Sequence, residues 1–338
     1  MRWCAFGVLA LVAIATARCD SAGEGRVLEI SATGIVKGLV YLDRNGNRQV
    51  DGADTVLRGV RVRLIGVGTL DTAASVQSDS AGGFRVPNVP IGSFVVALDT
   101  TTIGDTVRLI QLSAAQVVVR PGDSLTVTAT ISFPAVTVRA ARQLPAGRKV
   151  FVQGILLSPR PAFGDTTGHL ADTSAAIRLT RMRAAPVAGI GDSVRLLGLT
   201  TTRDGQATLD DVVTIPLGPS GGALPTVVSA AGARSANGGA LDAALVFVGD
   251  VTIVDTATVP GTGVTPPPTS DRRLTVDSTP ADTAGRVEVL LDAHAGFTGL
   301  VLAPFLPDSV LNVTGVLVPA GGGRWRLKPR IVSDAVVR

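Results

Sequence analysis

One short segment of the chain carries side-chain oxygens at regular intervals. Between Asp43 and Asp54, oxygen-bearing side chains occupy positions 1, 3, 5, 9 and 12 of a twelve-residue stretch, and apolar Val50 stands at position 8. Gln49 at position 7 can offer its backbone carbonyl. Ca²⁺ takes about six to eight oxygen ligands in a flexible shell. The spacing therefore predicts a calcium loop whose ligands are Asp43, Asn45, Asn47, Gln49, Asp51 and Asp54.

This spacing is the ligand register of an EF-hand loop, with two departures. Arg48 stands at position 6, where a glycine is usual, and Asp54 stands at position 12 in place of a bidentate Glu. Both changes predict weaker calcium binding. The alternative interpretation is a charged, glycine-bearing β-turn that exposes its three Asp side chains to water without a metal.

The N-terminus has the pattern of a secretory signal. Arg2 precedes an apolar run from Trp3 to Ala15, and Ala15-Thr16-Ala17 supplies the small residues that signal peptidase reads. The run is shorter than the ~20 apolar residues needed to span a bilayer. We expect a signal peptide over residues 1–17 and export to the periplasm, the cell surface or the medium. In the alternative, Cys19 is lipidated and anchors an outer-membrane lipoprotein, although Arg18 departs from the small residue expected there.

Composition indicates a β-rich protein without a run of basic residues that would bind nucleic acid. The chain has 338 residues, 46% of them apolar, with 39 Gly and 20 Pro. No amphipathic run reaches the ~10 to 12 residues that predict a helix. Lys and Arg number 31 against 27 Asp and Glu, and the arginines are spread singly along the chain. Scattered surface charge is the better interpretation of this balance.

Seven segments between residues 34 and 134 have the alternation or β-branched content of strands. They are Val36–Leu42, Val60–Ile65, Ala74–Asp79, Gly83–Val86, Ser93–Asp99, Thr106–Leu112 and Leu125–Phe133. Such spacing suits two packed antiparallel sheets. We therefore expect an all-β chain that begins, after a tether over residues 18–33, with a seven-stranded β-sandwich holding the calcium loop.

Four segments of this region resemble the B-type repeats of serine-aspartate-repeat surface proteins and related collagen-adhesin stalks. They are Gly38–Asp43 with the loop that follows, Leu57–Leu64, Asp79–Phe84 and Val89–Phe94. The resemblance implies a prealbumin-like sandwich that acts as a cell-surface spacer, stabilised by calcium or by an isopeptide bond. It carries the calcium ligands over as Asp43, Asn45, Asn47, Asp51 and Asp54.

Lys37 is the only lysine of the predicted sandwich and lies in its first strand, as a Lys–Asn isopeptide bond would require. No Glu occurs between Glu29 and Glu288 to serve as the buried acid of that chemistry. Alternation places Lys37 on the face opposite Val36 and Val40, toward solvent. We expect an ordinary surface lysine, with the crosslink as the alternative.

The rest of the chain predicts two diverged copies of a small barrel. After a polar hinge over Arg139–Lys149, five strand candidates fit a five-stranded Greek-key barrel of OB type at residues 148–216. They are Lys149–Leu157, Thr167–Asp172, Ala175–Arg181, Asp192–Thr200 and Gln206–Ile215. A linker over Pro216–Pro225 follows.

A second barrel is predicted over residues 226–338, because three of its segments repeat segments of the first. Leu245–Gly249 matches Val150–Gly154, Asp308–Gly315 matches Asp192–Gly198, and Arg324–Leu327 matches Gln206–Leu209. An insertion over Thr258–Arg272, with Pro266–Pro268 at its centre, should form an extended solvent loop.

The two-copy region resembles the paired OB-like modules of bacterial exported proteins. That resemblance implies binding of nucleic acid or glycan, and the cluster that best supports it is Arg324, Arg326, Lys328 and Arg330. Aromatic residues make up only 4% of the chain, few for base stacking. Alternation separates the cations from Trp325, so a rim of cations beside a buried Trp is the alternative.

Catalytic constellations are not recognisable in the sequence. His169 and His294 are the only histidines and have neither metal-ligand nor triad spacing, so each is expected at a loop or strand end. Asp210-Asp211 and Asp282 lack a cleft partner, and Ser220 lies in a glycine-rich linker. We expect a non-enzymatic surface or periplasmic spacer with a polymer or protein partner. The alternatives are a nucleic-acid or glycan binder, an accessory subunit of an exported hydrolase, or a hydrolase itself.

Overall fold

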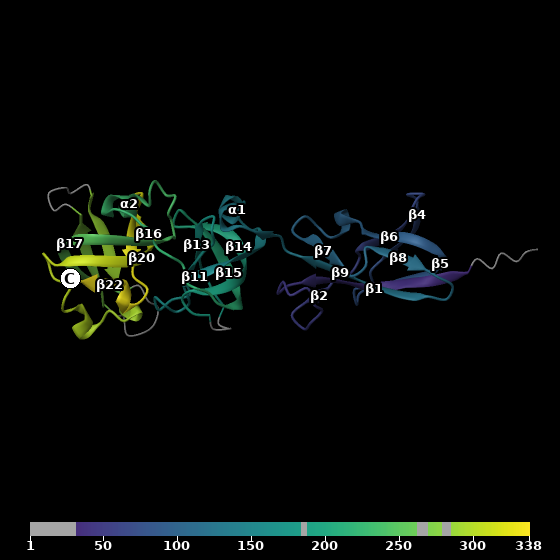
Figure 1. Cartoon of the computed structure of the whole chain (residues 1–338), viewed down its shortest axis with the longest axis horizontal. Coiled ribbons are helices and arrows are strands. Elements are labelled where there is room, and N and C mark those ends of the chain that lie inside the picture. Colours follow the sequence, from purple (N-terminus) through teal and green to yellow (C-terminus); the bar gives the residue numbers. More distant parts are fainter. Residues whose placement is uncertain (1–31, 184–187, 262–269, 279–284) are drawn as a thin grey trace, which may run out of the picture.

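The computed structural model describes residues 32–183, 188–261, 270–278 and 285–338. Strands are the dominant element throughout these ranges (Figure 1), which confirms the prediction of an all-β chain. The predicted signal peptide, Cys19, Asp282, the Pro266–Pro268 centre of the insertion and all but the end of the tether lie outside the described residues. None of the described helices combines the length and the apolar content that a membrane crossing requires.

The N-terminal part of the chain contains two sheets. The first has the order β2-β1-β9-β7. One edge of β1 pairs with β9, and its other edge pairs with both β2 and β5. The second has the order β4-β3-β6-β8. The strands of the first sheet are β1 (Thr33–Asp43), β2 (Thr55–Val56), β5 (Gly83–Pro90), β7 (Arg108–Leu112) and β9 (Ser124–Ser132). Those of the second are β3 (Arg61–Gly66), β4 (Thr72–Gln77), β6 (Gly92–Leu98) and β8 (Gln116–Val119), with the 3-10 turn η1 at Thr100–Thr102.

The two sheets bury one common core, to which alternate residues of their strands contribute. Val36 and Val40 of β1 meet Val62 and Leu64 of β3 in this cluster, and all four are fully buried. Lys37, between the two buried valines of β1, is exposed, as the alternation predicts. Each of the seven predicted segments overlaps a strand, and the structure adds the short strands β2 and β8.

The expectation of purely antiparallel sheets is wrong at β1 and β9, which run parallel over Ile35–Asp43 and Ser124–Ser132. The chain reaches β9 from β8, a strand of the other sheet, so no tight hairpin forces β9 to run against β1. Parallel pairing requires this kind of crossover connection.

The middle of the chain folds into a closed, OB-fold-like sheet. Its order is β11-β12-β13-β15-β14, and β14 returns to pair with β11. The long strand β11 makes closure feasible because Lys149–Ile155 pairs with β14 while Ile155–Ser158 pairs with β12. The strands are β10 (Ala135–Val136), β11 (Lys149–Ser158), β12 (Gly168–Ala171), β13 (Ala176–Leu179), β14 (Asp192–Arg203) and β15 (Gln206–Pro219).

The C-terminal part repeats this closed arrangement with the order β17-β18-β19-β21-β20 and a closing β17–β20 pair. The segments matched in the sequence fall on equivalent strands of the two barrels: β11 and β17, β14 and β20, β15 and β21. The strands are β16 (Thr226–Val227), β17 (Leu245–Pro260), β18 (Ser270–Asp277), β19 (Val287–Leu291), β20 (Val310–Gly321), β21 (Arg324–Lys328) and β22 (Ala335–Val337). The 3-10 turns are η3 (Ala293–Ala295), η4 (Gly299–Leu302) and η5 (Val332–Asp334).

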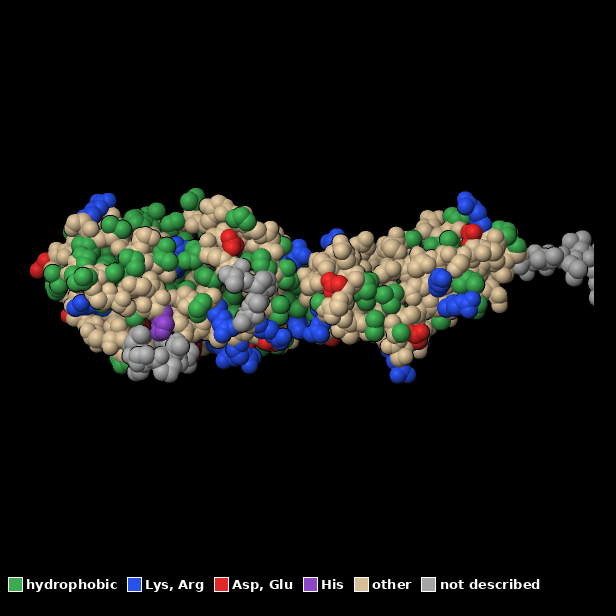
Figure 2. Space-filling model, turned by 90° about the horizontal axis from the view of Figure 1, so that it is seen from below, with side chains coloured by type: hydrophobic (Ala, Val, Ile, Leu, Met, Phe, Trp, Pro, Cys, Tyr) green, Lys and Arg blue, Asp and Glu red, His purple; other side chains and the backbone are tan. Residues whose placement is uncertain are grey.

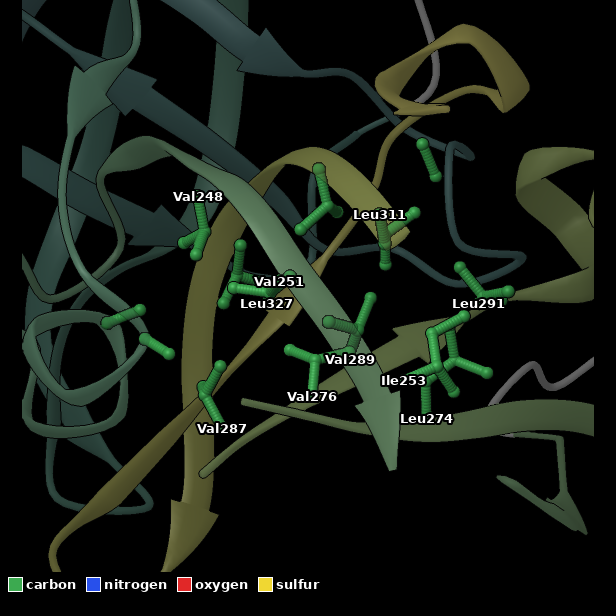
Figure 3. Close-up of a cluster of buried hydrophobic side chains, with 14 of the residues drawn as sticks. Val248, Val251, Ile253, Leu274, Val276, Val287, Val289, Leu291, Leu311 and Leu327 are labelled. Atoms are coloured by element: carbon green, nitrogen blue, oxygen red, sulfur yellow. The ribbon is translucent and has the colours of Figure 1, made fainter. Parts of the chain in front are cut away.

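Each barrel has its own apolar core. In the second barrel, alternate residues of β17, β18 and β19 point inward, including Ile253, Leu274 and Val289, and all three are fully buried (Figure 3). The flanks of the predicted insertion lie in this sheet, since Thr258–Pro260 pairs with Ser270–Arg272. These flanks are therefore paired ends of β17 and β18 and not loop, as the prediction had them.

A short helix precedes each barrel, which the sequence patterns did not predict. The segment interpreted as a polar hinge begins with α1 (Val138–Gln143), whose N-cap Thr137 accepts a hydrogen bond from the Ala140 N–H. α2 (Ala230–Ser235) has Ser229 as its N-cap. Each helix has only six residues, below the length at which periodicity predicts a helix. Their buried residues, such as Val138 and Ala230, cover the barrel cores.

Candidate functional site

The predicted calcium loop leaves the first sheet at the end of β1 and returns to it through β2. Tyr41 and Leu42 pair with Val56 and Thr55, so both ends of the loop are hydrogen-bonded into one sheet. Asp43, the last residue of β1, is buried at 1% exposure. Asp43 shares the face of Lys37 and not that of the core valines Val36 and Val40, so alternation does not explain its burial, and most of the loop that follows is exposed.

Carboxylate and amide oxygens fold this loop back on itself. The two Asp43 oxygens accept hydrogen bonds from the N–H of Gly46 at 2.6 Å and of Arg48 at 2.9 Å. Asp54 accepts from the backbone N–H of Arg44 and of Asp51, each at 3.1 Å. The first and last predicted ligands thus organise the two ends of the loop.

The remaining predicted ligands meet at Asp51. Its Oδ2 accepts from Asn45 Nδ2 at 2.8 Å and from Asn47 Nδ2 at 2.7 Å. The N–H of Ala53, together with these two amides, holds the pKa of Asp51 below its usual range, so the carboxylate is charged at neutral pH. Gln49 is exposed, and its N–H donates to Asn47 Oδ1 at 2.8 Å.

Arg48 has the backbone conformation for which glycine is usual. Its φ is 62°, in the left-handed region, and Gly46 has a φ of 74°. The loop keeps this turn despite the substitution because Asp43 holds the Arg48 N–H. The left-handed conformation costs a residue other than glycine about 1–2 kcal/mol. Arg48 therefore keeps a backbone conformation that is locally unfavourable.

The loop also touches the first barrel. Arg195 Nη1, on β14, donates to the backbone oxygen of Gly46 at 2.7 Å. Beside this contact lies a cavity of about 420 Å³, bordered by Arg48, Phe133 and Phe151. A Cβ on Gly46 would lie 2.9 Å from Arg195 Nη1, so the fit is close. The loop is therefore part of the joint between the N-terminal sheets and the first barrel.

Within the described ranges, no three His, Cys, Asp or Glu side chains are grouped as a metal centre. The loop offers a different set of oxygens, in which the side-chain amide oxygens of Asn45 and Asn47 accompany the carboxylates.

The four cations predicted as a ligand-binding cluster do not share one open face. Lys328 is buried beside Asp292, with 2.7 Å between Nζ and Oδ2. Arg330 is held by Asp334, and Arg326 lies 3.8 Å from Glu288. Arg324 is exposed. On the face shown in Figure 2, Lys and Arg side chains gather near the middle of the long axis and not at this end.

The adjacent acids Asp210 and Asp211, for which the sequence offered no cleft partner, belong to an arginine network. Although burial opposes its ionisation, hydrogen bonds from Arg181 and Arg203 hold the pKa of Asp210 far below its usual range. Asp211 accepts from Arg183 at 2.9 and 3.0 Å. These carboxylates stay charged and bound to guanidinium groups. Ser220 lies in an exposed segment outside the strands.

Two polar residues, His169 and Asp242, make hydrogen bonds inside the protein that the sequence did not predict. His169 lies in β12 and is only 2% exposed, with its Nδ1 at 2.8 Å from Ser158 Oγ. Asp242, before β17, accepts at Oδ1 from Gln206 and from Trp325, each at 2.7 Å. Gln206 belongs to one barrel and Trp325 to the other. Neither residue stands in a recognisable motif, because their partners are distant in sequence.

Comparison with known proteins gives no family assignment. No family model matches the chain, and no curated protein matches it. A structure of a murine DNA-binding protein with double-stranded DNA aligns with 58% of this chain and 98% of its own, at 8% identity and a TM-score of 0.24. A replication protein A heterotrimer bound to single-stranded DNA aligns with 83% of this chain and 93% of its own, at 10% identity and a TM-score of 0.21. The chain is similar to these proteins only at this low level.

Proposed function

We propose that this protein is an exported, non-enzymatic spacer that presents two OB-like barrels. Residues 34–134 would form a B-type-like calcium-binding sandwich, and residues 148–216 and 226–338 the two barrels. The observation that carries the proposal is the hydrogen bond from Arg195 to Gly46, because it joins the calcium loop to the first barrel. A metal that orders the loop then also stiffens the joint.

The donor set of the loop fits a hard cation. Asp43, Asn45, Asn47, Asp51 and Asp54 supply oxygens, and Gln49 supplies a backbone carbonyl, in agreement with the preference of Ca²⁺. The positive φ values of Gly46 and Arg48 support the same use, since they give the loop its sharp turn. Calcium, when bound, would add positive charge among the three carboxylates Asp43, Asp51 and Asp54.

Calcium should add to the stability of the folded chain, because the unfolded chain does not assemble these oxygens. At calcium about a hundredfold above the dissociation constant, the added free energy of unfolding is about 2.7 kcal/mol. We expect a clear rise in the melting temperature of the full chain with calcium relative to chelator, measured by differential scanning calorimetry.

A double variant, Asp51→Asn with Asp54→Asn, should abolish this rise, because it keeps the side-chain shapes and removes two charges. Asp71→Asn is the matched control, since Asp71 is an exposed acid of the same region outside the loop. Equal melting temperatures in millimolar calcium and in chelator would refute the metal site. The loop would then be a plain turn.

The alternative function is binding of nucleic acid or glycan by the barrels. Arg181 and Arg183 are exposed on the first barrel, which favours an anionic polymer, but each is paired with Asp210 or Asp211. A phosphate-binding groove must lose affinity as salt rises. Salt-sensitive retention of the chain on DNA would therefore favour this function over the spacer.

A further inference from the structure

The outer face of the first N-terminal sheet has an open depression of about 410 Å³. It lies where β5, β1 and β9 run side by side, on the face of β1 that points away from the core. Arg85, Lys37 and Thr126 form one row across these strands, because Lys37 pairs with Arg85 on one side and with Thr126 on the other. All three residues are exposed, so a partner in solution can reach them.

Lys37 and Arg85 are like charges placed directly opposite each other in an antiparallel pair. The Cβ atoms of such a pair lie about 4.5–5.5 Å apart, and like charges in this position destabilise a sheet. Neither cation forms an ion pair with any acid in the described part of the chain. The folded chain therefore keeps a repulsive pair without a contact that offsets it. Negative charge supplied by a partner would remove the repulsion.

The other end of the depression is acidic and open. Gly83 pairs with Leu39, two residues along the strands from the cation row, and has no side chain to cover the surface. A Cβ on Gly83 would lie 3.2 Å from Oδ2 of the exposed Asp79, so this carboxylate borders the depression. Asp79 Oδ1 accepts from the N–H of Ala81 and of Gly83, each at 2.8 Å. Its Oδ2 accepts no hydrogen bond from the described residues and can accept one from a hydroxyl group.

We propose that this depression binds one uronate unit of an acidic polysaccharide. The carboxylate of the sugar accepts from Lys37 and Arg85, and a ring hydroxyl donates to Asp79 Oδ2. The two rows of side chains are about 6.6 Å apart along the strands, so the two ends of one unit can meet different partners. Leu39 supplies an apolar surface for the ring. Two cations and one acid suit a ligand with one negative charge per unit.

Nucleic acid fits this surface less well. Proteins bind single strands by stacking bases on aromatic side chains in a cationic groove. Phe84, the aromatic residue of the lining, is only 4% exposed and belongs to the core between the sheets. Asp79 would also repel a phosphate next to one held by the cations. The site uses no residue of the calcium loop and none of the barrels, so it goes beyond the proposed function and does not depend on it.

Isothermal titration calorimetry of the full chain with hexagalacturonate tests the proposal. Low ionic strength limits screening of exposed charges, and a chelator prevents calcium from bridging protein and sugar. We expect saturable binding, and binding at least about tenfold weaker for the fully methyl-esterified hexamer, which keeps the sugar but loses its charge. Equal affinity for acid and ester, or no binding at millimolar hexagalacturonate, would overturn the proposal. Tighter binding of hexathymidylate would replace the sugar with a phosphate polymer and overturn it as well.

Lys37→Gln and Arg85→Gln should each weaken binding by about twofold to fivefold, the range of exposed ion pairs. Lys37→Glu is the sharper variant, because it places opposite charges across the pair. It should abolish binding and leave the melting temperature equal to or above that of the wild type. Arg61→Gln is the matched control, since Arg61 is an exposed cation of the other sheet that lies 3.8 Å from Asp99.

Two results with these variants would contradict the assignment. Wild-type affinity in Lys37→Glu, or an equal loss in Arg61→Gln, would show that the sugar does not bind at the cation row. A clearly lower melting temperature of Lys37→Glu would show that Lys37 stabilises the sheet, against the repulsion on which the proposal rests.

Discussion

At the scale of single residues, His169 is the titratable group whose surroundings most change its chemistry. It is fully buried in β12, and its pKa of about 3 lies well below the ordinary value of 6.5. The unfolded chain binds a proton at His169 below pH 6.5, whereas the folded chain does not. The contribution of this residue to stability is therefore fully present above pH 6.5 and is lost as the pH falls toward 3.

Protonation of His169 in the unfolded chain should lower the free energy of unfolding of the wild type by on the order of 1 kcal/mol for each pH unit below pH 6. His169→Gln should lower the stability at pH 7, because Ser158 loses its partner, and should flatten the dependence between pH 6 and pH 4. Urea unfolding across that range measures both effects. His294→Gln should keep the wild-type slope, and an unchanged slope in His169→Gln would contradict the assignment.

At the scale of elements, the hairpin of β14 and β15 shapes the first barrel. The two strands pair from Asp192 to Arg203 against Gln206 to Pro219, and Asp204-Gly205 forms the two-residue turn between them. Both turn residues have positive φ, 52° and 77°. This is the requirement of a type I′ turn, whose twist matches that of the strands, and Asp-Gly is a preferred sequence for it.

Gly205→Ala should destabilise the chain by about 1 kcal/mol, because an L side chain disfavours left-handed backbone. No atom lies within 4 Å of a Cβ built on Gly205, so the expected cost is conformational and not steric. Gly221→Ala is the matched control: its surroundings are equally open, and its φ is not in the left-handed region. Urea unfolding of the two variants provides the measurement, and equal stability of both would refute the turn assignment.

At the scale of the whole molecule, the two barrels are joined by more than their linker. Leu157, Phe163 and Ala176 of the first barrel share a buried cluster with Leu245 and Val316 of the second. Asp242 adds the polar part of this joint, since it accepts from Gln206 and Trp325 and lies 3.6 Å from Arg142 Nη2. The barrels should therefore unfold together.

Asp242→Ala should lower the free energy of unfolding by about 2–4 kcal/mol, because it leaves the buried Gln206 amide, the part-buried Trp325 N–H and the Arg142 guanidinium without their acceptor. The two barrels of the wild type should unfold in one calorimetric transition, and those of the Asp242→Ala variant in two. Asp255→Ala, an exposed acid of β17, is the control and should change stability little. A single transition that keeps the wild-type midpoint in Asp242→Ala would show that the apolar cluster alone couples the barrels.

Local pattern determined much of this protein. Alternation and turn residues predicted the strands, placed Lys37 on the open face of β1, and set the two-copy repeat that gives both barrels the same strand order. Residue spacing predicted the oxygen-rich loop and its unusual Arg48. These features depend on residues close together in the sequence, so they can be predicted without knowledge of the tertiary structure.

Tertiary structure alone decided which distant residues meet. The parallel pairing of β1 with β9 depends on a crossover through the other sheet, and the six-residue helices are stabilised by burial against the barrels rather than by their own periodicity. Arg326 and Lys328 looked like a surface cluster in the sequence, yet pairing with acids and the approach of His169 from the other barrel turned them into the lining of a cavity. Long-range pairing sets such contacts, and no local spacing records them.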